Sequence, residues 1–134
     1  MNLRKIILVA EDNLSNFKLL DAVLSKDYDL IHAWNGKEAV EMFEQHQPQL
    51  VLMDITMPVM DGYEATREIR KFSAIVPIAG LTARAFSDDE QEGYDCGMTE
   101  YLTKPMNRLS GNLVGISINL CKSIQKELFI NNTP

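Results

Sequence analysis

The feature that most constrains the fold is a repeated alternation between short apolar runs and segments with a helical period. The apolar runs predict strands at 5–10, 28–33, 49–54, 76–82 and 100–104. The central runs are apolar at successive positions, which is typical of parallel strands covered by helices on both faces. Because parallel strands joined by helices require right-handed crossovers, the pattern predicts an α/β fold with one doubly wound sheet.

The segments between the predicted strands are helix candidates. They cover 16–26, 36–46, 63–72 and 88–96. The first places Phe17, Leu20 and Leu24 on one stripe, which indicates a helix that turns one face toward a core.

Length and patterning predict a single domain. The chain has 134 residues, enough for one hydrophobic core, and no repeat, low-complexity tract or linker divides it. We expect one domain over 1–134, with a core of about 4–122 and a C-terminal tail at 123–134.

Composition argues against several functional classes. The longest purely apolar run, 6–10, is too short for a membrane span or a signal-peptide core. Cys96 and Cys121 form neither a disulfide framework nor a zinc motif. A formal net charge of −6 argues against non-specific nucleic-acid binding, which needs a basic face. We therefore expect a cytoplasmic protein with reduced thiols that binds neither a membrane nor nucleic acid directly.

Polar residues stand where the predicted strands end. Glu11 and Asp12 follow the first strand, and the third, fourth and fifth strands end on Asp54, Thr82 and Lys104. Each alone is compatible with a helix cap or a surface charge. In a doubly wound sheet, however, these ends share one edge, where ligands bind. Carboxylates crowded there repel one another unless a cation bridges them. Together they indicate metal-assisted phosphoryl transfer to a carboxylate.

Four motifs along the chain carry a family resemblance. In order they are EDN, DITMPVMDG, LTA and YLTKP. The chain resembles, over nearly its whole length, the receiver domain of two-component response regulators, and most of all the receivers attached to hybrid histidine kinases. The resemblance implies a flavodoxin-like, three-layer α/β/α fold whose five-stranded parallel sheet has the order 2-1-3-4-5.

The resemblance also implies a role for each site residue. Asp54 is the expected phospho-acceptor. Asp12 is expected to bind Mg²⁺ directly and Glu11 largely through water, while Asp54 and the backbone carbonyl of Thr56 complete the protein ligands. Mg²⁺ prefers such oxygen ligands, and Mn²⁺ is an expected substitute. Thr82 is expected to donate a hydrogen bond to the phosphoryl group.

Further roles concern the lysine, the switch and the loops. Lys104 is expected to contact a phosphoryl oxygen as a point charge, before a Pro105 peptide bond that is typically cis in the family. Pro58 and Gly62 close the acceptor loop. Thr82 and Tyr101 are the expected switch, read by a partner on the face of the fourth helix, fifth strand and fifth helix. For Tyr101 the alternative is a strand aromatic with its hydroxyl in water.

Two positions are expected to tune the lifetime of the phosphoryl group. They are Thr56 and Arg84, which vary within the family. Gly111 and Gly115 depart from the family pattern, since each costs up to ~1 kcal/mol in the interior of the expected last helix. His32 is interpreted as an isolated residue, and Trp34 as a partly exposed one before a helix.

The implied function is that of a phospho-acceptor in a two-component or phosphorelay pathway. The expected partners are a histidine kinase or a histidine phosphotransfer domain, and a downstream protein. The receiver would phosphorylate and dephosphorylate itself without turning over an independent substrate, and kinase activity would require a larger hybrid kinase. Two alternatives remain at this point. One is a phosphohydrolase of the haloacid dehalogenase type, although Thr56 stands where that family has a second aspartate. The other is a pseudo-receiver that binds partners without phosphotransfer.

Overall fold

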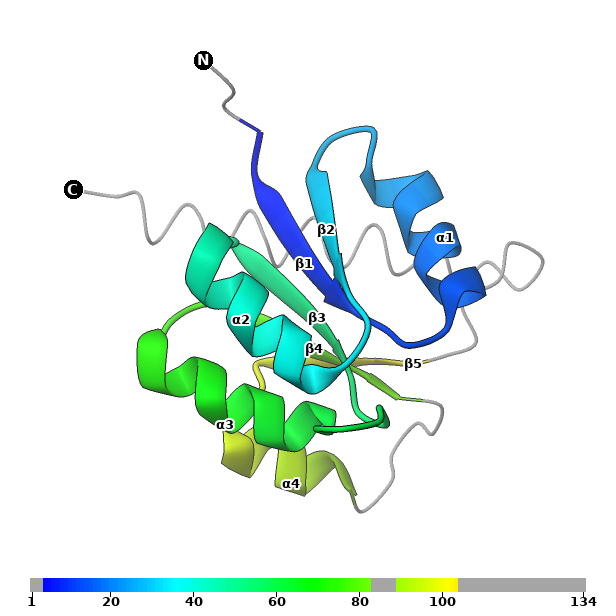
Figure 1. Cartoon of the computed structure of the whole chain (residues 1–134). Helices are drawn as coiled ribbons and strands as arrows, with labels where there is room; N and C mark the ends of the chain where they lie inside the picture. The colour runs from blue at the N-terminus through cyan, green and yellow to red at the C-terminus, as the bar shows by residue number, and fades with distance from the viewer. Residues whose placement is uncertain (1–3, 83–88, 104–134) are drawn as a thin grey trace.

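Five parallel strands form one sheet in the computed structural model, which describes residues 4–82 and 89–103 (Figure 1). The strands are β1 (Ile6–Ala10), β2 (Asp29–Ala33), β3 (Leu50–Asp54), β4 (Ile78–Thr82) and β5 (Glu100–Thr103). The helices are α1 (Leu14–Leu24), α2 (Gly36–His46), α3 (Gly62–Phe72) and α4 (Asp89–Cys96). The order of the strands is β2-β1-β3-β4-β5, so the predicted doubly wound topology is confirmed.

Alternate residues of the central strands enter two different cores. One core joins Leu8, Val51, Met53 and Ile78 to residues of α2 and α3, including Phe43 and Ile69. The other joins Ile7, Val9, Leu50, Leu52 and Leu81 to Leu20 and Leu24 of α1. Figure 1 shows the same division, with α1 on one face of the sheet and α2, α3 and α4 on the other. Strands apolar on both faces are therefore a consequence of burial on both faces.

Each of the first three helices begins at a polar cap. Asn13, Asn35 and Asp61 each accept a hydrogen bond from a backbone N–H three residues ahead. Such caps typically contribute ~1 kcal/mol. The prediction of a helix over 16–26 is wrong in its bounds, because the Asn13 cap starts α1 at Leu14 and the helix ends at Leu24. The predicted helix over 36–46 is confirmed.

Arg70 fixes the approach to β5. Its Nε and Nη2 donate to the carbonyl of Gly97 at 2.9 and 2.6 Å, and its Nη1 donates to the carbonyl of Val76 at 2.7 Å. Gly97 has a φ of +114°, a region that favours glycine. The end of α3 is thereby tied to the turn between α4 and β5, the strand that carries Tyr101.

Several sequence-based expectations fall outside the described residues. These are the last helix with Gly111 and Gly115, the tail at 123–134, and Cys121. Cys96 is a buried free thiol, as expected, and burial raises its pKa. Within 4–82 and 89–103, no helix is long and apolar enough to cross a bilayer.

Candidate functional site

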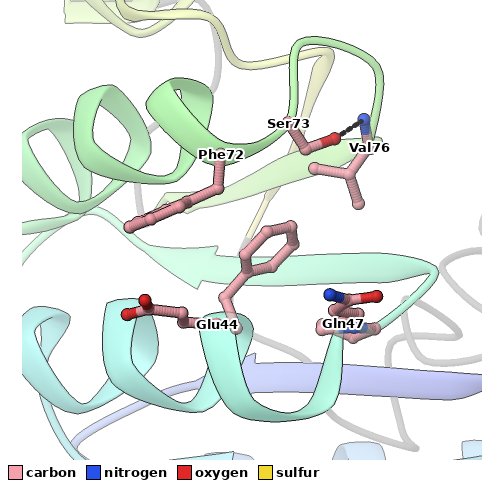
Figure 2. Close-up of a pocket in the computed structure, with 7 residues that line it drawn as sticks. Glu44, Gln47, Phe72, Ser73 and Val76 are labelled. Carbon is pink, nitrogen blue, oxygen red and sulfur yellow. Dashed lines mark hydrogen bonds between the residues drawn. The ribbon is translucent and has the colours of Figure 1, made fainter.

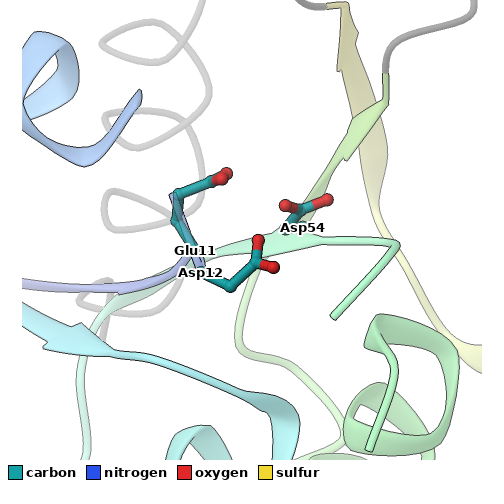
Figure 3. Close-up of side chains that lie close together, drawn as sticks. All are labelled: Glu11, Asp12 and Asp54. Atoms are coloured by element: carbon teal, nitrogen blue, oxygen red, sulfur yellow. The ribbon is translucent and has the colours of Figure 1, made fainter. Parts of the chain in front are cut away.

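Three carboxylates meet at the carboxyl edge of the sheet (Figure 3). Glu11 and Asp12 follow β1, and Asp54 is the last residue of β3. Each offers an oxygen within 4.8 Å of the others. Because β1 and β3 are adjacent, with Ala10 paired to Met53, both strands end at the same level. The structure therefore brings together the acidic residues that the sequence predicted would share this edge.

The Glu11 carboxylate is buried and held by the start of α1. Its Oε1 accepts hydrogen bonds from the backbone N–H of Asn13 and from Nδ2 of Asn16, both at 3.2 Å. The backbone N–H of Glu11 in turn donates to the carbonyl of Ala33 at 3.0 Å. Asp12, by contrast, is exposed. One acid is thus oriented by the protein, and the next faces solvent.

Asp54 is nearly buried, with 6% of its surface exposed. Its Oδ1 accepts a hydrogen bond from the backbone N–H of Thr56 at 3.1 Å. The loop that follows closes tightly, since Gly62 N–H donates to the Ile55 carbonyl at 2.9 Å. A Cβ on Gly62 would overlap the Asp54 carbonyl oxygen, so this close approach requires glycine. The carboxylate is consequently fixed at the end of a rigid strand.

The acceptor loop contains a strained turn at Val59. This residue has a φ of +71°, and Met60 N–H donates to the Pro58 carbonyl at 2.8 Å across it. A β-branched residue in this region is an outlier, and such strain collects at functional sites. The Met60 carbonyl also accepts from Gly36 N–H at 3.0 Å, which ties the loop to the start of α2. Val59 itself is 78% exposed.

The donor set fits a hard divalent cation. All three side chains offer carboxylate oxygens, which Mg²⁺ prefers, and exposed Asp12 leaves room for the waters that Mg²⁺ usually keeps. Three carboxylates this close also repel one another, so a bound cation would stabilise the cluster. The site is therefore a candidate magnesium centre.

Thr82 reaches the same edge from the neighbouring strand. Leu81 is paired with Asp54, and the Leu81 carbonyl accepts a hydrogen bond from Ile55 N–H at 3.3 Å, so Thr82 lies one residue beyond the acceptor. The predicted roles of Arg84, Lys104 and Pro105 fall outside the described residues.

Tyr101 is packed inward between β4, α3 and α4. A Cβ on Gly93 of α4 would overlap the Tyr101 hydroxyl, and one on Gly80 of β4 would lie 2.9 Å from the ring. The Tyr101 hydroxyl is hydrogen-bonded to Tyr63 and to the backbone of Gly93. Burial and then the Tyr63 hydrogen bond raise the pKa of Tyr101. The inward packing of the Tyr101 side chain against α4 favours the switch position over a strand aromatic that points into water.

Sequence reasoning missed three residues around the site. Tyr63 and Gly93 hold Tyr101, and the signal for Gly93 was a glycine inside a helical segment, which often has a packing reason. His32 is the third, and its interpretation as isolated is wrong. Its Nε2 lies 2.8 Å from the carbonyl oxygen of Glu11, and its ring contacts two other aromatic rings.

A separate cavity of about 370 Å³ lies between the ends of α2 and α3 (Figure 2). Its lining includes Phe43, Gln47, Phe72 and Val76. Gln47 precedes β3 and Val76 precedes β4, so the cavity lies at the amino edge of the sheet, opposite the carboxylates. It belongs to a different part of the surface from the candidate magnesium centre.

The fold and the acidic edge define a class of signalling domain. The family model described as the response regulator receiver domain matches residues 7–111, and the chain belongs to this family. The chemotaxis protein CheY of Halobacterium salinarum is 36% identical over 107 residues, which cover 79% of this chain and 89% of that protein. Hybrid signal transduction histidine kinase I of Dictyostelium discoideum is 35% identical over 131 residues, 90% of this chain.

The chain spans only 7% of the length of that hybrid kinase and 8% of the length of the sensor protein EvgS of Escherichia coli, which it also matches. Among solved structures, the receiver domain of the sensor histidine kinase PA1611 of Pseudomonas aeruginosa has a TM-score of 0.76 and 34% identity. The match covers 92% of this chain and 96% of that one, and that structure has a magnesium ion coordinated in its active-site cleft.

Proposed function

We propose that this receiver domain accepts a phosphoryl group on Asp54 from a phosphohistidine of a histidine kinase or a histidine phosphotransfer domain. The proposed Mg²⁺ ligands are Glu11, largely through water, Asp12, Asp54 and the Thr56 carbonyl. The observation that carries the proposal is the cluster of three carboxylates, one of them a buried aspartate at a strand end.

The chemistry needs a positioned nucleophile and neutralised oxygens. An Asp54 oxygen attacks the phosphorus atom and forms a P–O bond, while the P–N bond breaks and its electron pair returns to the donor imidazole. The hydrogen bond from Thr56 N–H orients the Asp54 carboxylate for this attack. When bound, Mg²⁺ supplies charge neutralisation at the phosphoryl oxygens. Thr82 and Lys104 are the proposed contacts to the remaining phosphoryl oxygens.

The signal is proposed to leave the domain through Thr82 and Tyr101. A phosphoryl group on Asp54 is a new hydrogen-bond acceptor that draws the Thr82 hydroxyl inward, which changes the packing around the Tyr101 ring. A downstream protein would distinguish the two packings on the face that contains α4 and β5. Thr56 and Arg84 are the proposed positions that tune the lifetime of the phosphoryl group.

The alternatives are less well supported. A phosphohydrolase of the haloacid dehalogenase type needs a second aspartate two residues after the nucleophile, and exposed Thr56 occupies that place. A pseudo-receiver has no need for an acidic cluster with a buried aspartate. The same transfer would operate in a stand-alone regulator or within a hybrid kinase.

A phosphorylation assay tests the proposal. The protein is incubated with acetyl phosphate and Mg²⁺, and its intact mass is measured. We expect a mass increase of one phosphoryl group that requires Mg²⁺ and is lost in Asp54→Asn. Absence of the increase in a protein that binds Mg²⁺ would identify a pseudo-receiver, and sustained release of phosphate from a phosphomonoester would identify a phosphohydrolase.

A further inference from the structure

The peptide unit between Glu11 and Asp12 lies just beyond the paired residues of β1 and β2. The last pair of these strands is Ala10 with Ala33, and Glu11 N–H still donates to the Ala33 carbonyl at 3.0 Å. The Glu11 carbonyl instead meets a side chain, His32 Nε2, at 2.8 Å. A carbonyl oxygen can only accept, so His32 Nε2 carries the hydrogen and donates it.

The His32 ring is itself held by aromatic neighbours. The Phe17 ring of α1 is stacked on it, with centroids 3.9 Å apart and planes 3° apart. The Trp34 ring, which follows β2, lies at 4.3 Å and is tilted by 40°. These contacts restrict rotation of the imidazole, so its N–H is oriented before any ligand binds.

The two hydrogen bonds fix the backbone from which both acidic side chains project. If the Glu11 carbonyl lost its donor, the peptide plane between the two acids would lose one of its restraints, and a tilt of that plane would redirect the Asp12 carboxylate. Asp12 is exposed, so side-chain packing does little to position it. We propose that His32 is a positioning residue for the magnesium centre, which sets the direction of the Asp12 carboxylate through the Glu11 carbonyl.

This inference rests on the proposed function, because it takes Glu11 and Asp12 as magnesium ligands. Residues that orient metal ligands typically change metal affinity by about 10–100-fold when replaced. His32→Phe keeps an aromatic ring beside Phe17 and Trp34 but removes the N–H donor. His32→Gln removes the ring but keeps a side-chain N–H. His46→Phe is the matched control, because His46 is an exposed residue at the far end of α2.

The test is a titration with Mg²⁺ alone, in which binding is measured by calorimetry and by backbone amide shifts. Thermal melts without metal report the stability of each variant. We expect the dissociation constant of His32→Phe to rise by about 10-fold, with a metal-free melting temperature close to that of the wild type. His32→Gln should recover part of the affinity, and His46→Phe should bind like the wild type. Wild-type affinity in a folded His32→Phe would overturn the proposal.

A second measurement needs no variant. Nitrogen NMR of the wild-type imidazole should show the hydrogen of neutral His32 on Nε2, and a hydrogen on Nδ1 would overturn the proposal even if His32→Phe failed to fold.

The experiments distinguish a failure of the proposed metal site from a failure of the positioning role. If the wild type does not bind Mg²⁺, or Asp12→Ala binds it equally well, the proposed metal site is wrong. If the wild type binds Mg²⁺, Asp12→Ala does not, and His32→Phe binds Mg²⁺ like the wild type, only the positioning role is wrong.

Discussion

The Tyr101 hydroxyl lies against Gly93 so closely that no side chain fits at position 93 without displacing it. We therefore expect Gly93→Ala to drive the Tyr101 ring out of its inward position, although alanine favours the helix by ~1 kcal/mol. A double-mutant cycle with Tyr101→Ala measures the coupling, because the clash with the ring disappears when the ring is absent. The remaining close atom, the Met98 sulfur at 2.9 Å from the added Cβ, belongs to a flexible side chain that can move aside. Chemical unfolding of the four proteins should show that Gly93→Ala destabilises the wild type but stabilises Tyr101→Ala. Equal effects in both backgrounds would show that the ring does not depend on the glycine.

The partly buried Tyr101 phenol predicts a loss of stability in alkali. Its pKa is raised in the folded state by burial and by Tyr63, so the unfolded chain releases the proton first. The contribution to stability is complete below the ordinary tyrosine pKa of 10.0 and is lost as the pH rises above it. Urea unfolding at several pH values should therefore show a steeper alkaline decline for the wild type than for Tyr101→Phe. An equal alkaline decline in Tyr101→Phe would contradict this prediction.

The strained turn at Val59 predicts a stabilising substitution. Strain of this kind costs about 1–3 kcal/mol, whereas the greater freedom of glycine in the unfolded chain costs about 0.4–1 kcal/mol. Val59→Gly should thus raise the free energy of unfolding by about 1 kcal/mol. Ile75→Gly is the control, because Ile75 is also exposed and apolar but lacks a positive φ. A Val59→Gly protein no more stable than Ile75→Gly would mean that the turn stores little strain.

The crowded carboxylates predict opposite effects of one substitution with and without metal. Asp12→Ala should raise the metal-free stability, because it removes one of three neighbouring charges. It should also abolish stabilisation by Mg²⁺, which in the wild type is expected to reach about 2.7 kcal/mol at 100 times the dissociation constant. Thermal melts over a Mg²⁺ series check both effects. An unchanged response to Mg²⁺ in Asp12→Ala would contradict the assigned ligands.

Signal transmission through Thr82 predicts a variant that binds the activating group without responding to it. Beryllofluoride is a stable mimic of the phosphoryl group. Thr82→Ala should still bind beryllofluoride with Mg²⁺, because the proposed Mg²⁺ ligands remain. The amide shifts that beryllofluoride causes in α4 and β5 should be reduced, since the hydroxyl that senses the new acceptor is absent. Shifts in α2 serve as the internal reference, because α2 packs against β1 and β2, on the opposite side of the sheet order from β5. A full response of α4 and β5 in Thr82→Ala would refute this route.

Local patterns are enough to predict a doubly wound parallel sheet and its acidic edge, whereas the order of the strands was predicted from the family resemblance. Apolar runs and helical periods alternate in the sequence, and parallel strands place their carboxyl ends together, so the sequence alone groups Glu11, Asp12 and Asp54. The predicted start of α1 is too late, because Asn13 belongs to the acidic motif and also caps the helix. Capping depends on a hydrogen bond that residue type alone does not settle.

Contacts between distant side chains were decided only by the tertiary structure. The sequence determined that Tyr101 would stand on the last strand, but the packing of α3 and α4 against β4 decided that its hydroxyl would meet Tyr63 and Gly93. The sequence likewise placed His32 on the second strand, but it did not indicate that the imidazole ring would reach the Glu11 carbonyl. The physical reason is that periodicity specifies which face a residue occupies, whereas a hydrogen bond depends on the relative position of two elements, and that position is set by the whole core.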